Sequence, residues 1–131
     1  MLIYAHRGAS SDFKEGSKAA YIGAITQGAD GFECDVRLTK DKQIICYHDS
    51  DTSRLSNIDL KISKSSYKEL KAKVDPYRLD ELLDLFYYLL KDPVIHLIGM
   101  DLLLPLTLHS YSLQSLDQYL IIFWYHYRDS K

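Results

Sequence analysis

The sequence predicts an α/β fold in a single domain. Apolar strand-like runs alternate along the chain with amphipathic helical segments, which is the pattern of a sheet covered by helices. No shift in composition and no linker rich in Gly, Ser or Pro divides the 131 residues. A hydrophobic content of 47% is typical of one ordinary globular core. We therefore treat residues 1–131 as one domain.

Four elements are predicted in the first half of the chain. Residues 2–5 are a short apolar run that ends at a polar loop, and they predict a strand. Residues 17–27 contain helix formers, and Gly28 follows them as a C-terminal cap would, so they predict a helix. Residues 31–38 alternate apolar and polar side chains, which is typical of a strand. Residues 43–47 predict another strand, which forms with 31–38 either a hairpin or two successive barrel strands.

The second half is less regular. Residues 52–66 are polar, and no element is predicted for them. Residues 66–73 predict a helix, and residues 78–91 predict the clearest amphipathic helix of the chain. The apolar stripe of that second helix consists of Leu79, Leu82, Leu83, Phe86, Leu89 and Leu90. Residues 94–104 predict a buried strand, and residues 115–127 fit a helix or a strand equally well.

Charge and cysteine content argue against two classes of protein. The formal net charge is -2 and the pI is near 6.2, whereas binding a nucleic acid requires a basic face that displaces counterions. We therefore expect no nucleic-acid partner. The two cysteines, Cys34 and Cys46, lie inside apolar runs, so we expect buried thiols rather than a disulfide scaffold.

The sequence gives no sign of export or of a membrane span. Its start, MLIYAHRG, has no basic region and too short an apolar run for a signal peptide. The apolar stretch 94–108 is interrupted by His96, Asp101 and Pro105, and it is shorter than the roughly 20 residues that cross a bilayer. We expect a cytoplasmic protein without a transmembrane segment.

Five side chains suited to catalysis fall at strand ends, or on one face of a strand, within the first 48 residues: His6, Arg7, Glu33, Asp35 and His48. Strand ends converge at one mouth of an α/β barrel, so these side chains are expected to meet. Glu33 and Asp35 project to one face and offer the oxygen ligands that Mg²⁺ or Ca²⁺ prefers. Arg7 offers a planar fork for phosphate oxygens. Two histidines beside a divalent ion could serve as the acid and the base that cleave a phosphodiester.

Each of these residues also has a structural explanation when it is taken alone. His6 could be a strand-end histidine bonded to backbone, and His48 could belong to an ordinary turn. Glu33 and Asp35 could form the solvated face of a half-buried antiparallel strand. The remaining histidines have no partners at useful spacing and are expected to be structural: His96, His109 and His126. The joint occurrence of the five residues favours a site.

These motifs follow one another in a recognisable order. The strings AHRGAS, GADGFECDVRLTKD and HD resemble the N-terminal region of the glycerophosphodiester phosphodiesterase family. The resemblance is dense over residues 3–55, weaker in the helix 78–91, and largely stops after residue 91. It implies a (β/α)-barrel of the TIM type that uses a divalent cation to hydrolyse glycerophosphodiesters to glycerol 3-phosphate and an alcohol.

The resemblance also implies a role for each of the five residues. His6 and His48 correspond to the acid/base pair, Glu33 and Asp35 to two metal ligands, and Arg7 to the residue that holds the phosphate. The glycerol hydroxyl of the substrate would attack first, giving a cyclic phosphate that water then opens. The expected cofactor is therefore Mg²⁺ or Ca²⁺, and the expected partner is a small glycerophosphodiester.

Three features differ from the family pattern. The family's Pro-Glu-Asn-Thr segment reads KEGS here, at residues 14–17. The Glu-x-Lys pair of the third strand corresponds to residues 99–101, GMD, where Gly99 stands in place of the Glu, and this predicts weaker metal binding. A complete barrel takes about 250 residues, so the chain is expected to form a partial or truncated barrel. Such a barrel would expose a strand edge and an apolar surface at residues 119–127, through which the chain could self-associate.

Two other functions remain open on the sequence alone. The chain could be a non-catalytic remnant or interaction module that keeps the fold but has lost the metal site, a reading that Gly99 supports. It could also be a phospholipase D-like enzyme acting on choline lipids, which shares the histidine and paired-carboxylate chemistry. The HRGAS and TKD strings favour the phosphodiesterase over the phospholipase.

Overall fold

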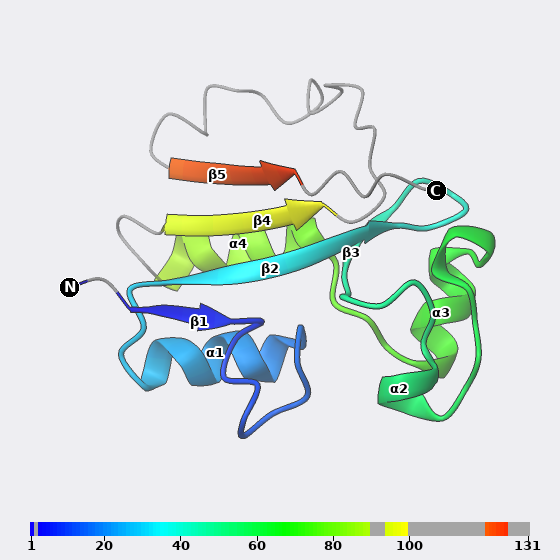
Figure 1. Ribbon diagram of the computed structural model, residues 1–131, viewed down its shortest axis with the longest axis horizontal. Helices are drawn as coiled ribbons and strands as arrows, with labels where there is room; N and C mark the ends of the chain where they lie inside the picture. Colours follow the sequence, from blue (N-terminus) through cyan, green and yellow to red (C-terminus); the bar gives the residue numbers. More distant parts are fainter. Residues whose placement is uncertain (2, 90–93, 100–119, 126–131) are drawn as a thin grey trace.

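The computed structural model of the chain describes residues 1, 3–89, 94–99 and 120–125, with side chains for residues 1 and 3–85. Within these ranges it forms a mixed five-stranded sheet and several helices (Figure 1). The strands are β1 (Tyr4–His6), β2 (Gly31–Leu38), β3 (Ile44–Cys46), β4 (Val94–Gly99) and β5 (Leu120–Tyr125). The helices are α1 (Lys18–Thr26), α2 (Ser53–Ser56), α3 (Tyr67–Lys73), α4 (Leu79–Leu89) and the 3₁₀ turn η1 (Ile62–Lys64). The predicted α/β class is confirmed.

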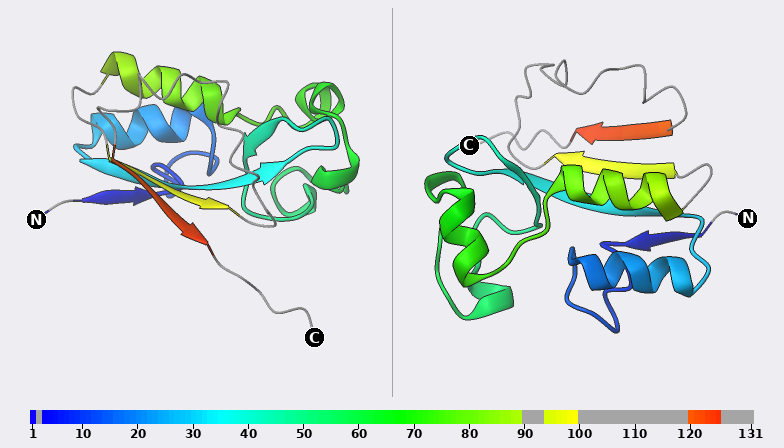
Figure 2. Two further views of the ribbon diagram at one scale, coloured as in Figure 1. Left: turned by 90° about the horizontal axis from the view of Figure 1, so that it is seen from above. Right: turned by 180° about the vertical axis from the view of Figure 1, so that it is seen from behind.

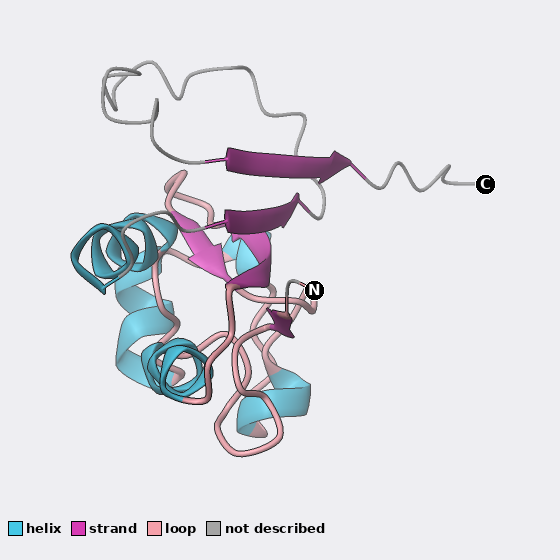
Figure 3. Ribbon diagram, turned by 90° about the vertical axis from the view of Figure 1, so that its left-hand side faces the viewer, coloured by secondary structure: helices cyan, strands magenta, loops and turns pink. Residues whose placement is uncertain are grey.

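The sheet has the order β1-β2-β4-β5, and each of these neighbouring pairs is parallel. In the view of Figure 3, β5 lies at the edge of the sheet remote from β1. The exception to the parallel order is β3, which pairs antiparallel with the end of β2 through Val36 and Cys46. Residues 31–47 are therefore a hairpin, which settles the choice that the sequence left open.

One face of the sheet is covered by α1 and α4, as two further views show (Figure 2). The alternate residues Phe32, Cys34 and Val36 of β2 are buried against this layer. They form one hydrophobic cluster with Tyr21 and Ala24 of α1 and with Leu79 and Leu82 of α4. Because successive side chains of a strand point to opposite faces, Glu33 and Asp35 point to the face that these two helices do not cover.

Most predicted elements agree with the structure. Helix α1 begins after Ser17, whose hydroxyl accepts a hydrogen bond from the backbone N–H of Ala20. It is followed by Gly28 with a φ of +85°. Helix α4 matches the predicted amphipathic helix, although residues 90 and 91 lie outside the described range. None of the described helices is long and apolar enough to cross a membrane.

The region predicted to be irregular, residues 52–66, contains two short elements, α2 and η1. Polar side chains fix the start of α2, whereas η1 buries Ile62 in a hydrophobic cluster. The Asp51 carboxylate accepts hydrogen bonds from the backbone and hydroxyl of Ser53 at the start of α2. Such short turns show no hydrophobic periodicity, so the prediction of an irregular segment missed both elements.

The C-terminal part of the chain is described only through two strands. Strand β4 covers the first six residues of the predicted strand 94–104, and the rest lies outside the described residues. Strand β5 lies within residues 115–127, so the described part of that segment is a strand and not a helix. The side chains of residues 119–127 are not described, and self-association through them stays a prediction.

The loop that leaves β1 passes directly against α1, and Gly8 makes this approach possible. Gly8 has a φ of +78°, and a Cβ atom there would lie 2.6 Å from the carbonyl carbon of Ala20. The next residue donates its backbone N–H to the oxygen of Ala20 at 2.8 Å. Any side chain at position 8 would therefore displace the loop that carries His6 and Arg7.

We expect Gly8→Ala to lower the free energy of unfolding by about 2 kcal/mol or more, because a strained φ and a backbone clash act together. Urea denaturation followed by circular dichroism measures this loss. Gly28→Ala is the matched control, since Gly28 also has a positive φ but nothing lies within 4 Å of an added Cβ. Equal losses in the two variants would contradict the role given to the contact with Ala20.

Candidate active site

The end of β1 brings His6 to Glu33. The parallel register pairs His6 with Glu33 across β1 and β2. The Nε2 atom of His6 lies 3.6 Å from Oε2 of Glu33. The His6 side chain is 67% exposed, whereas that of Glu33 is 15% exposed. His6 therefore sits at the rim of the site, where it can meet a substrate, and Glu33 lies beneath it.

Arg7 is held in an unusual backbone conformation that turns the chain across the ends of the strands. Its φ is +58°, in the left-handed region that non-glycine residues rarely adopt. Two backbone hydrogen bonds of 3.0 Å hold it there: its N–H donates to the oxygen of Glu33, and its oxygen accepts from the N–H of Gly16. A strained residue kept in place by such bonds is typical of a functional site.

The guanidinium of Arg7 lies between two carboxylates. Its Nε lies 2.8 Å from Oδ2 of Asp35, and its Nη1 donates a 3.2 Å hydrogen bond to Oε1 of Glu15. The contact with Asp35 is an ion pair rather than a hydrogen bond, because neither Nε nor Oδ2 has a hydrogen-bond partner. Arg7 thus balances part of the negative charge at the site.

Glu33 and Asp35 form a buried pair of carboxylates. The side chain of Asp35 is 5% exposed, so the pair is not the solvated face of a strand, and that alternative is wrong. Both oxygens of Glu33 and Oδ2 of Asp35 are buried without a hydrogen-bond partner. Burial, and then the charge of Asp35, raise the pKa of Glu33 to about 7, although Arg7 opposes this shift.

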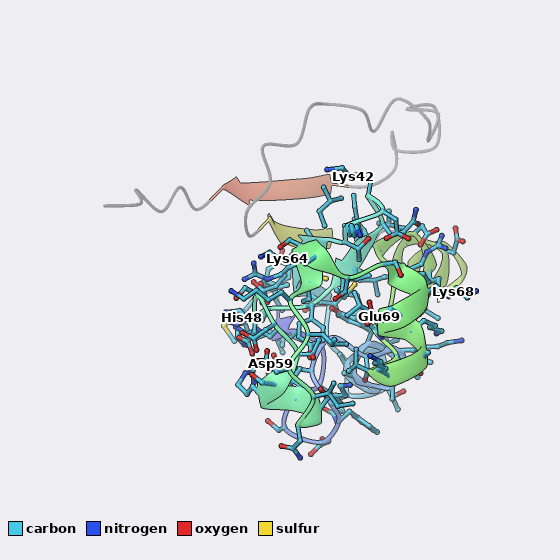
Figure 4. All side chains as sticks on the ribbon, turned by 90° about the vertical axis from the view of Figure 1, so that its right-hand side faces the viewer. Lys42, His48, Asp59, Lys64, Lys68 and Glu69 are labelled. Atoms are coloured by element: carbon cyan, nitrogen blue, oxygen red, sulfur yellow. The ribbon has the colours of Figure 1, made fainter. Side chains whose placement is uncertain are left out.

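His48 follows β3 and reaches the same site from the other side. Its backbone oxygen accepts hydrogen bonds from Nε and Nη2 of Arg37 at 2.8 and 2.6 Å. Its ring Nδ1 lies 2.7 Å from Oδ1 of Asp49. In Figure 4, His48 lies well away from Lys68 of α3, so α3 is not part of this site. The His48 side chain is 32% exposed and therefore remains accessible.

A small pocket joins these side chains. Its lining includes Arg7 and Asp35 from the β1 and β2 side, His48 and Tyr47 from the β3 side, and Glu15 from the loop before α1. His6 and Glu33 adjoin this group through the contact between them and through the charge of Asp35. The structure thus gathers all five residues that the sequence singled out.

Sequence reasoning gave no role to four residues at this site: Glu15, Tyr47, Asp49 and Arg54. Arg54, from α2, donates hydrogen bonds to Glu15 and to Asp49. Asp49 was noted only as the second residue of the HD string. Tyr47 lies beside them, and burial, with a further contribution from the charge of Asp49, raises its pKa to about 12. The only signal for Asp49 was its place next to His48, and Arg54 lies in a stretch without any pattern.

The carboxylate pair fits part of a divalent metal site. Three buried carboxylate oxygens without hydrogen-bond partners, both of Glu33 and Oδ2 of Asp35, would be stabilised by a cation. On β4, the residues in register with Glu33 and Asp35 are His96 and Ile98. Among the residues with described side chains, no group of three or more His, Cys, Asp or Glu residues could hold a metal ion.

Comparison with known proteins identifies the family. Residues 6–94 match the model of the glycerophosphoryl diester phosphodiesterase family. The chain is 52% identical over 54 residues to a probable glycerophosphodiester phosphodiesterase 1 of Mycobacterium tuberculosis, covering 41% of the chain and 20% of that protein. It is 39% identical over 69 residues to a glycerophosphodiester phosphodiesterase of Bacillus altitudinis, covering 53% of the chain and 28% of that protein.

The fold agrees with that of solved proteins of this kind. The crystal structure of a glycerophosphodiester phosphodiesterase from Thermotoga maritima superposes with a TM-score of 0.74 at 27% identity, and the match covers 94% of the chain and 54% of that structure. The chain thus spans about half of this structure and less of the curated relatives. Because the family model matches more than half of the chain, the chain belongs to the glycerophosphoryl diester phosphodiesterase family.

Proposed function

We propose that the chain carries the first part of the active site of a metal-dependent phosphodiesterase, which hydrolyses glycerophosphodiesters to glycerol 3-phosphate and an alcohol. The observation that carries this proposal is the buried pair of Glu33 and Asp35, which lies beside His6 and His48 and has three oxygens without a hydrogen-bond partner. A fold alone would not require two carboxylates on one buried face of a strand. Family membership supports the same substrate class.

The metal in this proposal is Mg²⁺ or Ca²⁺, held by Glu33 and Asp35. When bound, it would offset negative charge on the phosphoryl oxygens of the substrate. The raised pKa of Glu33 reflects a carboxyl group that is costly to ionise without a counter-charge. Arg7, already placed beside Asp35, has the planar guanidinium that is suited to hold a phosphate oxygen.

The two histidines are proposed to move the protons. The nucleophile, which is the glycerol hydroxyl of the substrate, must lose a proton, and the leaving alkoxide must gain one. His6, at the exposed rim, ends β1, whereas His48, on the pocket wall, follows β3, so the two would approach the phosphate from different directions. The cyclic phosphate formed in this way would be opened by water with the proton transfers reversed.

We include in the proposal that the described sheet is the opening of a (β/α)-barrel of the TIM type. Parallel neighbours, with α1 and α4 on one face and the candidate site at strand ends, suit such a barrel. In this arrangement His6 lies at the carboxyl end of β1, and Glu33 and Asp35 lie within β2, at and just beyond the level of that end. The antiparallel β3 would be a short insertion that delivers His48.

A second candidate is a non-catalytic member of the family. It is favoured by β4, because neither residue in register with the Glu33 and Asp35 pair is a carboxylate. In this case the two histidines and Arg7 would remain from an active ancestor. The candidates differ in whether a divalent cation binds the pair and in whether any diester is cleaved.

The first candidate predicts that the chain releases glycerol 3-phosphate from glycerophosphocholine when Mg²⁺ or Ca²⁺ is present. We expect His6→Ala and His48→Ala each to lower kcat by about 100-fold or more, because a positioned proton donor or acceptor contributes on that scale. A coupled assay for glycerol 3-phosphate measures the rate. Lys68→Ala, on α3 and away from the site, is the control and should keep the full rate. No hydrolysis with either metal would favour the non-catalytic candidate.

The carboxylate pair also predicts how the stability of the metal-free chain changes with pH. The pKa of Glu33 is about 7 in the folded chain and near 4.5 in the unfolded chain. Between these values the folded state keeps a proton that the unfolded state releases, so this group lowers stability as pH rises from 4.5 to 7. We expect Glu33→Gln to remove this loss, worth about 1–3 kcal/mol.

Urea denaturation without metal at the two ends of that pH range provides the measurement. Glu69→Gln, which changes an exposed carboxyl group on α3, is the control for any general effect of removing a charge. If the gain in stability from Glu33→Gln were the same at both ends of the range, Glu33 would not be held in a protonated form by its surroundings.

A further inference from the structure

Arg54 links helix α2 to two other segments at the edge of the site. It stands on α2, and its Nη1 and Nη2 donate hydrogen bonds of 3.1 and 2.5 Å to the two oxygens of Glu15, in the loop before α1. Its Nε donates a 2.5 Å hydrogen bond to Oδ2 of Asp49, after β3. One planar guanidinium thus holds two carboxylates that lie 34 residues apart in the chain, a geometry that a lysine cannot reproduce.

The carboxylate that Arg54 holds is the one that contacts His48. Oδ2 of Asp49 accepts from Arg54, and Oδ1 lies 2.7 Å from Nδ1 of His48. Burial alone would raise the pKa of Asp49, but the hydrogen bonds from Arg54 and His48 lower it. An ionised carboxylate only accepts hydrogen bonds, so Nδ1 of His48 must carry the proton. In the neutral ring, Nε2 is then left as the acceptor.

We infer that Arg54 is a positioning residue for His48: by fixing the Asp49 carboxylate, it keeps the His48 ring in the Nδ1–H tautomer with Nε2 free to take a proton. The same guanidinium continues through Glu15 to Arg7 and from there to Asp35. The two sides of the candidate site are therefore joined by one chain of alternating charges. The catalytic value of this arrangement rests on the proposed function, but the tautomer itself does not.

The alternative is that Arg54 only ties loops together. Its side chain is 47% exposed, and an exposed ion pair by itself contributes little to stability. If Arg54 only tied the loops together, its replacement would change the free energy of unfolding but not which nitrogen of His48 carries the proton. The tautomer of His48 therefore separates a positioning role from a structural one.

The experiment is nuclear magnetic resonance of the full chain labelled with ¹⁵N in its histidine rings, at about pH 8.5, where a histidine ring is largely neutral. Long-range ¹H–¹⁵N correlation shows which ring nitrogen is protonated, and His48→Gln assigns the signal. We expect Nδ1–H in the unchanged chain. Asp49→Ala and Arg54→Ala should each lose most of this form in favour of Nε2–H, and Arg54→Lys should lie between, because an ammonium cannot bond both carboxylates.

Two matched controls accompany these variants. Asp51→Ala removes a neighbouring carboxylate that contacts Ser53 rather than His48, and Arg78→Lys changes an arginine that pairs with Asp80. Both should leave the His48 signals unchanged. The inference is overturned if the unchanged chain has Nε2–H, or if Arg54→Ala stays folded and keeps Nδ1–H. It is also overturned if both Arg54 variants lose the dispersed amide spectrum, since Arg54 would then be a structural residue.

An activity measurement separates this inference from the proposed function. If the chain hydrolyses glycerophosphocholine, Arg54→Ala should lower kcat by about tenfold or more with little change in KM, because proton transfer suffers rather than binding. If the chain hydrolyses no diester but the tautomer shifts as expected, the proposed function fails and the positioning contact stands. An active chain whose kcat is unchanged by Arg54→Ala contradicts the positioning role.

Discussion

The buried pair of Glu33 and Asp35 is the constraint on which the rest of the site depends. Two carboxylates whose oxygens lack hydrogen-bond partners are unfavourable in a protein interior unless positive charge lies nearby. The chain provides one such charge in Arg7, and placing it there requires a left-handed backbone at Arg7 and a glycine at position 8. The loop after β1 thus places Arg7 beside the charges on β2.

Much of this arrangement could be predicted from the sequence, because it follows from local patterns. The alternation in β2 sets Glu33 and Asp35 opposite the core face of Phe32 and Cys34, and strand ends bring His6 beside them. Arg54 could not be predicted, because its partners are distant in sequence and no periodicity marks it. The sequence could not show that β3 forms a hairpin with β2, because two successive barrel strands would have the same apolar pattern.

Family membership and the geometry of the site both support the proposed phosphodiester substrate, but they differ in how strongly they support catalysis. The His6, Arg7 and His48 side chains lie around the two carboxylates, as the proposed function requires. Strand β4 contributes no carboxylate in register with them. The strength of divalent binding depends on ligand charge and number. Two carboxylates are therefore expected to bind Mg²⁺ or Ca²⁺ weakly, and the loss of either one should abolish binding.

Isothermal titration calorimetry with Mg²⁺ and with Ca²⁺ tests the central claim most directly. The account predicts saturable heat from one site in the unchanged chain, loss of that heat in Glu33→Gln, and no loss in Glu69→Gln, which removes an exposed carboxyl group far from the pair. Absence of binding by the unchanged folded chain, or binding that survives Glu33→Gln, would contradict the claim that the buried pair is a cation site.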